Sequence, residues 1–246
     1  MVQSIDRAMQ IINILISDDS KNSWAISEIA NETGLPLGSV HRIISTLMKH
    51  GLVSQIPETK RYKVGYTWME IGLRSLENID FREATRPIME QLALEVKESV
   101  YFSIPNGNFA IIIDRVDSPS SVRIIDNLGE RIPLHIGAAN KSMLAYMDDK
   151  KANRIINQLI DSEDDRLTLL QMLREIRTNG FAVSYSEKTE GTASIAAPVI
   201  GFNNKIIGSL YINLLSHQIP DDRLSFLIEK VKNAANEASM RIGKTP

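Results

Sequence analysis

Residues 27–51 read SEIANETGLPLGSVHRIISTLMKHG, and this stretch decides the fold of the N-terminal part of the chain. It predicts two short helices separated by a tight turn at Gly34. Ser27 is of a type that caps helix N-termini, and Pro36 suits the first turn of the second helix, which we expect to run to about His50. A helix, a short turn with glycine and a second helix form the helix-turn-helix arrangement.

The second of these helices has one face suited to a core and others suited to DNA. The expected core stripe is Val40, Ile43 or Ile44, Leu47 and Met48. The remaining faces are small or polar and carry no acid, which fits a helix that enters a DNA groove, although an ordinary solvated surface has similar composition. The predicted DNA contacts of this helix are Ser39, His41, Arg42, Ser45, Thr46 and Lys49. Arg42 is the candidate for reading guanine.

A predicted β-hairpin follows, with strands at 52–56 and 61–64 and a turn at 57–60. A hairpin directly behind a recognition helix is a wing. Its predicted DNA contacts are Lys60, Arg61 and Lys63. Between Pro36 and Gly65 the chain has five basic residues and one acidic residue, although its net charge is −2. Attraction to phosphates acts over about 10 Å, so a local basic cluster is sufficient.

The composition favours a two-domain globular protein. A length of 246 residues with 43% hydrophobic residues allows each half to bury a core. The absence of cysteine excludes disulfides, thiolate nucleophiles and cysteine zinc sites, and it suits a reducing cytoplasm. The first residues lack the pattern of a signal peptide, and no stretch approaches the roughly 20 apolar residues of a membrane span. We therefore expect a cytoplasmic protein with no membrane partner.

The remainder of the chain predicts a connecting helix and then a sheet domain. The helix at 66–76 either packs against a partner or is an ordinary structural helix. We expect further helices at 81–96, 138–147, 150–161, 166–179 and 221–241, and strands at 99–104, 109–114, 122–125, 195–200 and 206–214. Asn106-Gly107 is a strong hairpin signal. Strands interrupted by a helical block indicate an α+β domain with helices on one or both faces of the sheet.

Several of these segments resemble the IclR family of bacterial regulators. The matching residues of the first half are Ser27–Ala30, Thr33–Pro36, Ser39–Ile44, Leu47, Gly51–Val53, Tyr62 and Gly65. Those of the second half are Pro133–His135, Ala139–Ala145, Gly180–Ser184, Glu187, Gly191 and Ile195–Val199. No single motif decides, but the series keeps its order over essentially the whole chain.

The resemblance implies a two-domain α+β architecture. It places a winged helix-turn-helix at 1–65, a linker helix at 66–80 and a GAF-like mixed α/β effector-binding domain at 81–246. It also implies a homodimer, or a dimer of dimers, on a palindromic double-stranded operator.

By motif position the resemblance also implies an effector pocket in the second domain. Its expected residues are Ala138, Ala139, Ser184, Ser194, Tyr211 and Asn213. Small residues at the start of a helix expose N–H groups that favour an anion, or they merely permit close packing on a sheet. Tyr211 and Asn213 alternate along the last predicted strand and so share one face. Many relatives have an acid at the position of Ser184 and a cysteine at that of Ser194, which indicates an altered pocket here.

Enzyme motifs are missing from the sequence. It contains no Gly-x-Ser-x-Gly elbow and no HExxH zinc motif. Two of the four histidines fall on the predicted recognition helix or its end, which leaves His135 and His217 isolated. Carboxylate pairs such as Asp164-Asp165 lie at expected helix boundaries, where capping explains them better than acid–base chemistry. We therefore expect no catalytic activity, no metal and no cofactor.

These observations lead to one hypothesis and one alternative. We expect a sequence-specific transcriptional regulator, by family default a repressor, whose operator affinity responds to a small metabolite such as an organic or sugar acid. The ligand would alter the spacing of two recognition helices in a dimer, and both half-site contacts would then weaken together. In the alternative, the second domain only oligomerises or contacts another protein.

Overall fold

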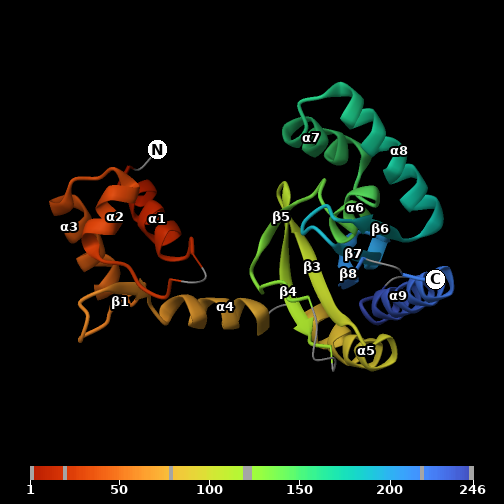
Figure 1. Ribbon diagram of the computed structural model, residues 1–246, viewed down its shortest axis with the longest axis horizontal. Coiled ribbons are helices and arrows are strands. Elements are labelled where there is room, and N and C mark those ends of the chain that lie inside the picture. The colour runs from red at the N-terminus through yellow and green to blue at the C-terminus, as the bar shows by residue number, and fades with distance from the viewer. Residues whose placement is uncertain (1–2, 19–20, 78–79, 119–123, 217–218, 244–246) are drawn as a thin grey trace. The chain divides into compact units, whose positions relative to one another are not determined.

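The structure is a computed structural model that describes residues 3–18, 21–77, 80–118, 124–216 and 219–243. The chain forms two compact units, Met1–Ile79 and Asp80–Pro246, which are described separately (Figure 1). The division falls within the segment that the sequence predicts as a linker. None of the described helices combines the length and the hydropathy that a membrane crossing requires.

The first unit is a winged helix-turn-helix, as predicted. Its elements are α1 (Gln3–Leu15), α2 (Ile26–Thr33), α3 (Leu37–Lys49), β1 (Val53–Gln55), β2 (Tyr62–Val64) and α4 (Thr67–Glu77). The strands β1 and β2 are antiparallel and form the wing. One core joins α1, α2, α3 and the wing, and its buried members include Ile11, Ile29, Val40, Ile44 and Tyr62.

The ends of α2 and α3 differ in detail from the prediction. Ser27 lies in the first turn of α2, and Ala25 occupies the N-cap position. The N-terminus of α2 is nevertheless capped, because the Glu28 carboxylate accepts the Ala25 N–H at 2.8 Å. Gly34 ends the helix with φ of +66°, as its residue type predicts. Pro36 stands at the N-cap position of α3 and not inside its first turn.

The start of α4 is tied to the base of the wing. The Thr67 hydroxyl donates to the carbonyl of His50 at 3.1 Å, and the indole N–H of Trp68 donates to the carbonyl of Leu52 at 2.9 Å. The N–H of Gly65 also donates to Leu52, at 2.9 Å. The chain after α3 and the chain before α4 are therefore held in direct contact.

The second unit is an antiparallel sheet between helices. Its elements are α5 (Asp80–Val96), β3 (Ser99–Asn106), β4 (Phe109–Val116), β5 (Arg131–Pro133), α6 (Ala138–Ala145), α7 (Asp149–Leu159), α8 (Glu163–Asn179), β6 (Ala182–Tyr185), β7 (Thr192–Ile200), a short 3₁₀ turn (Phe202–Asn204), β8 (Ile206–Leu215) and α9 (Asp221–Arg241). The six strands have the order β5-β4-β3-β8-β7-β6, and every neighbouring pair is antiparallel.

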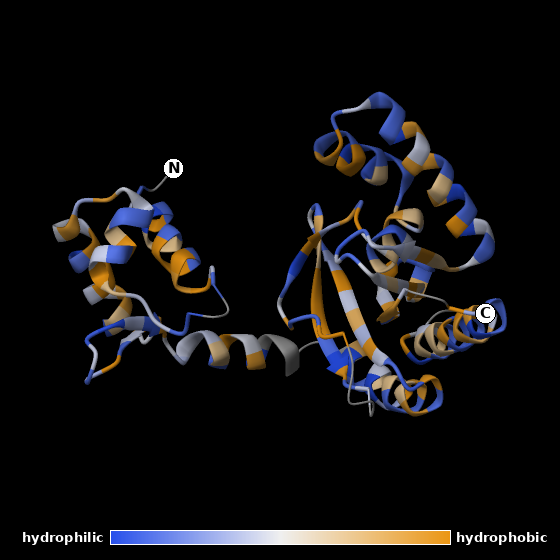
Figure 2. Cartoon of the chain, in the orientation of Figure 1, coloured by the Kyte–Doolittle hydropathy of each residue, from blue (hydrophilic) through white to orange (hydrophobic). Residues whose placement is uncertain are grey.

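Helices cover both faces of this sheet. On one face Phe102 and Ile212 pack with residues of α5 and α9. On the other face Tyr101 and Tyr211 pack with residues of α6, α7 and α8. The split follows from the two-residue alternation of strand side chains. Figure 2 shows hydrophobic and hydrophilic residues mixed along α9, and its buried residues Leu227, Val231 and Ala238 recur at helical spacing.

One predicted strand is wrong, and two strands of the sheet were not predicted. The predicted strand at 122–125 is wrong for Ile124 and Ile125, which lie in a loop, and residues 122 and 123 fall outside the described part of the chain. The strands β5 and β6 have three and four residues and were not predicted. They are the two edges of the sheet, and a strand that short shows no clear alternation in sequence.

Candidate functional site

The outward face of α3 carries the predicted DNA contacts. Val40, Ile44 and Leu47 are buried, so the opposite side of the helix faces solvent. Met48, predicted as core, is 39% exposed. The predicted contact residues that are exposed are His41, Arg42, Ser45, Thr46 and Lys49, and Ser39 is half-buried. The arrangement presents polar donors along one continuous helix surface.

The three basic residues predicted to contact DNA from the wing differ in exposure and in their partners. Lys60 is exposed in the turn, and Lys63 is half-buried on β2. Arg61 turns inward, where its guanidinium donates to Glu28 Oε2 at 2.7 Å and to the carbonyl of Ser23 at 3.1 Å. Arg61 therefore holds the wing against the start of α2.

The carboxylate of Glu28 gives this unit a pH-dependent contact. The N–H of Ala25, together with Lys21 and Arg61, holds the pKa of Glu28 below its ordinary value of 4.5. A carboxyl whose folded pKa is depressed stabilises the fold above its unfolded pKa and loses that effect as pH falls through the folded value. We expect Glu28→Gln to melt below the wild type at pH 7, with the difference shrinking below about pH 4.5. Thermal unfolding across this range measures it.

The matched control for this prediction is Glu32→Gln, since Glu32 is exposed on the same helix. It should shift the melting temperature little at any pH. A Glu28→Gln difference that stays constant from pH 7 to pH 4 would contradict the assignment of this carboxylate.

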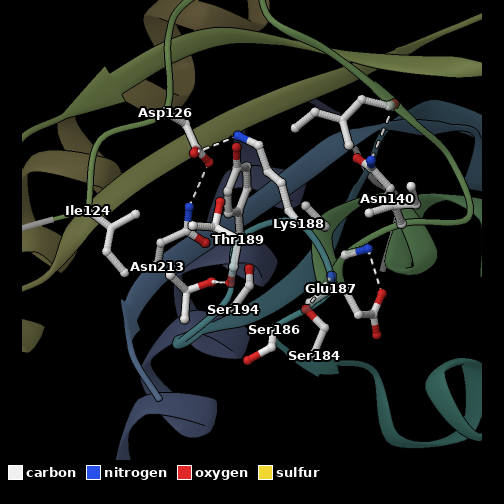
Figure 3. Close-up of a pocket in the computed structure, with 17 residues that line it drawn as sticks. Ile124, Asp126, Asn140, Ser184, Ser186, Glu187, Lys188, Thr189, Ser194 and Asn213 are labelled. Atoms are coloured by element: carbon white, nitrogen blue, oxygen red, sulfur yellow. Dashed lines mark hydrogen bonds and ion pairs between the residues drawn. The ribbon is translucent and has the colours of Figure 1, made fainter. Parts of the chain in front are cut away.

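A cavity of about 40 Å³ lies on the α6 side of the sheet in the second unit. All six residues predicted for the effector pocket line it: Ala138, Ala139, Ser184, Ser194, Tyr211 and Asn213. Figure 3 labels Ser184, Ser194 and Asn213 among them. They come from α6, β6, β7 and β8, so four elements converge there. The volume is room for a few water molecules.

The N-terminus of α6, predicted as an anion site, is occupied by the chain's own groups. The N–H of Ala138 donates to the Ser184 hydroxyl at 3.0 Å. The N–H of Gly137 donates to Glu187 Oε2 at 2.8 Å, and Lys141 pairs with the other oxygen of Glu187 at 2.6 Å. Glu187 thus stands where an external carboxylate would dock.

The tyrosine predicted for the pocket is packed rigidly. The ring of Tyr211 stacks on Tyr101, with centroids 5.1 Å apart. Burial raises the pKa of Tyr211 well above 10, so its hydroxyl stays neutral at physiological pH. Tyr101 donates to the carbonyl of Ile124 at 2.7 Å and accepts the N–H of Asp126 at 3.2 Å. These contacts hold Ile124 and Asp126 beside the cavity.

Sequence reasoning missed Asp126, a buried carboxylate at the cavity. Asn213 donates to its Oδ2 at 2.7 Å, and Lys188 pairs with its Oδ1 at 2.6 Å (Figure 3). Lys188 also pairs with Glu130 at 2.9 Å. No local signal marks these residues, because Asp126 follows a wrongly predicted strand and Lys188 lies in a polar turn. Within the described residues, no cluster of histidine and carboxylate groups could hold a metal ion.

Comparison with known proteins gives consistent matches over the chain. Residues 73–240 match the family described as bacterial transcriptional regulator IclR C-terminal, and residues 4–57 match the IclR helix-turn-helix domain. The transcriptional regulator KipR of Bacillus subtilis is 32% identical over 99% of this chain and 98% of its own length. The transcriptional repressor AllR of Escherichia coli is 27% identical over 98% of this chain and 90% of its own.

A solved structure shows the same fold. The crystal structure of an IclR homologue from Microbacterium hydrocarbonoxydans, complexed with 4-hydroxybenzoate, matches with a TM-score of 0.81 and 16% identity over 97% of this chain and 98% of that one. The matched relatives are regulators and not enzymes. The predicted two-domain α+β architecture and the predicted family are both confirmed. The chain belongs to the IclR family of DNA-binding transcriptional regulators.

Proposed function

We propose that this regulator is a cytoplasmic repressor that binds a palindromic operator as a homodimer or a dimer of dimers. The observation that carries the proposal is the exposed polar face of α3, which includes Arg42, together with the basic wing that follows it in the chain. The repressor role is supported by the relative AllR, which is named a repressor. We assign α3 to the major groove and Lys60 and Lys63 to the phosphate backbone.

We further propose that a small organic or sugar acid in the second unit controls operator affinity. The convergence of six expected residues on one cavity supports this assignment. The related fold that holds 4-hydroxybenzoate makes a carboxylic acid a reasonable ligand class. Melting curves and DNA titrations with a panel of such acids test it. A panel that changes neither would favour a second unit that only oligomerises or binds another protein.

The DNA-binding role predicts a specific dependence on salt. Each lysine that neutralises a phosphate contributes about 0.9 to the slope of log affinity against log salt concentration. We therefore expect Lys49→Gln and Lys63→Gln each to lower this slope by about 0.9, with the same loss on any duplex. Fluorescence anisotropy with a duplex from the region upstream of the gene measures the slope.

Arg61 provides the comparison for this experiment, because its charge is engaged with Glu28. Arg61→Gln should lower the melting temperature more than the other two variants and change the slope less. Purified protein that shows no salt-sensitive association with any duplex would refute the proposed function.

A further inference from the structure

The cavity of the second unit contains an acid whose cationic partner comes from the cavity rim. The Asp126 side chain is 7% exposed, and its two oxygens accept from Asn213 and Lys188 (Figure 3). Lys188 belongs to the loop between β6 and β7, and its side chain is 28% exposed. The flexible side chain of Lys188 thus reaches from this surface loop into the cavity.

This arrangement limits what can enter. A volume of about 40 Å³ is small for a metabolite, so a bound ligand gains room when a side chain at the cavity moves aside. Lys188 is the most readily displaced, because its stem is flexible and partly exposed. Withdrawing its ammonium would leave Asp126 buried without a cation, which is strongly unfavourable. An entering ligand is therefore favoured when it brings a replacement donor to Asp126.

The charges around the cavity also favour a ligand that carries a positive group. Three carboxylates, Asp126, Glu130 and Glu187, face the two ammonium groups of Lys141 and Lys188. The local balance is therefore negative by about one charge. A simple anion would make it more negative, and two N–H groups at the start of α6, those of Gly137 and Ala138, are already bonded to Glu187 and Ser184. A zwitterion leaves the balance unchanged.

We propose that the ligand of this cavity is a small acid that also carries a protonated amine, as an amino acid does. Its ammonium replaces that of Lys188 on Asp126, and its carboxylate pairs with the released Lys188. This inference rests on the proposed function, in that it takes the cavity as the effector site. It narrows the ligand class from organic acids in general to nitrogen-bearing zwitterions, and it makes Asp126 the residue that determines specificity.

The amine site can be tested without knowing the natural ligand. Lys188→Ala removes four side-chain atoms that propylammonium replaces, and propan-1-ol has the same size without the charge. We expect propylammonium to raise the melting temperature of Lys188→Ala saturably and to bind about tenfold tighter than propan-1-ol. The wild type should show no such effect. The double variant Asp126→Asn/Lys188→Ala should lose the rescue.

A second double variant controls for Glu130, which also loses its partner when Lys188 is removed. Glu130→Gln/Lys188→Ala should keep the rescue by propylammonium. Rescue that propan-1-ol reproduces, that survives Asp126→Asn, or that depends on Glu130 would overturn the proposal. Should Lys188→Ala fail to fold, Lys188→Ser, which leaves nearly the same space open, repeats the test.

The wild-type chain then tests the zwitterion directly. The probes are amino acids paired with their 2-hydroxy acids: alanine with lactate, aspartate with malate, and glutamate with 2-hydroxyglutarate. We expect an amino acid to bind at least about tenfold tighter than its partner, and Asp126→Asn to erase that preference. Equal or tighter binding of the hydroxy acids overturns the proposal and leaves the acid-responsive function intact. If neither this panel nor the organic and sugar acids alter DNA association, the effector part of the proposed function is refuted, and the propylammonium result then decides the amine site alone.

Discussion

Replacing Arg42 with alanine is expected to weaken binding to the specific operator by about 5- to 150-fold, the equivalent of roughly 1–3 kcal/mol. Arg42 is exposed on α3, and its planar guanidinium can donate two parallel hydrogen bonds to one guanine. Binding to a scrambled duplex should fall much less, because that binding depends on phosphates. Anisotropy titrations of both duplexes at one salt concentration give the ratio.

Two further variants separate base reading from charge. Arg42→Lys keeps the charge and loses the planar fork, so it should reproduce most of the loss on the operator. Lys49→Gln should weaken binding to both duplexes alike. An equal loss on the two duplexes for Arg42→Ala would make Arg42 a phosphate contact, and no loss on either would place it outside the interface.

The first unit could be predicted well because its signals are local. The three-residue and four-residue spacing of Val40, Ile44 and Leu47 fixes which face of α3 is buried. Gly34 marks the turn through its backbone conformation. The inward turn of Arg61 could not be predicted, because its partner Glu28 lies 33 residues away and the pairing exists only after folding.

Parts of the second unit could not be predicted from local sequence patterns. Ile124 and Ile125 have the residue types of a strand, yet they lie in a loop, and Ile125 is 50% exposed. Hydrophobic residues alone do not make a strand, because a strand also needs a neighbour with free backbone groups. The error concealed Asp126, which follows directly and closes the cavity.

The pocket residues were reached through family resemblance and not through periodicity. Ala138 and Asn213 lie far apart in sequence, and only the sheet order and the placement of α6 bring them together. The structure explains how this chain manages with serine, and not an acid, at position 184. The Ser184 hydroxyl accepts the Ala138 N–H, and Glu187 supplies the carboxylate at the neighbouring Gly137 N–H. Ser184 and Glu187 therefore accept two N–H groups at the start of α6 that the sequence alone predicted to be available to an anion.

Gly65→Ala is expected to destabilise the first unit by about 3 kcal/mol or more, which is large for one methyl group. A Cβ at Gly65 would stand 1.9 Å from the carbonyl oxygen of Gly51, which no side-chain movement can relieve. The same backbone segments carry the hydrogen bond from Gly65 to Leu52, so separating them would also open the base of the wing. Urea unfolding followed by the fluorescence of Trp24 and Trp68, both in this unit, measures the loss.

Gly38→Ala is the matched control for this prediction. Gly38 lies inside α3, and a Cβ there would meet no other atom within 4 Å. Alanine favours a helix over glycine by about 1 kcal/mol, so this variant should be more stable than the wild type. If Gly65→Ala unfolded at the same urea concentration as the wild type, the contact between Gly51 and Gly65 could not be what holds the wing to α4. Lower stability of Gly38→Ala would indicate that α3 tolerates no added methyl group near its N-terminus, and Gly38→Ala would then no longer serve as the control.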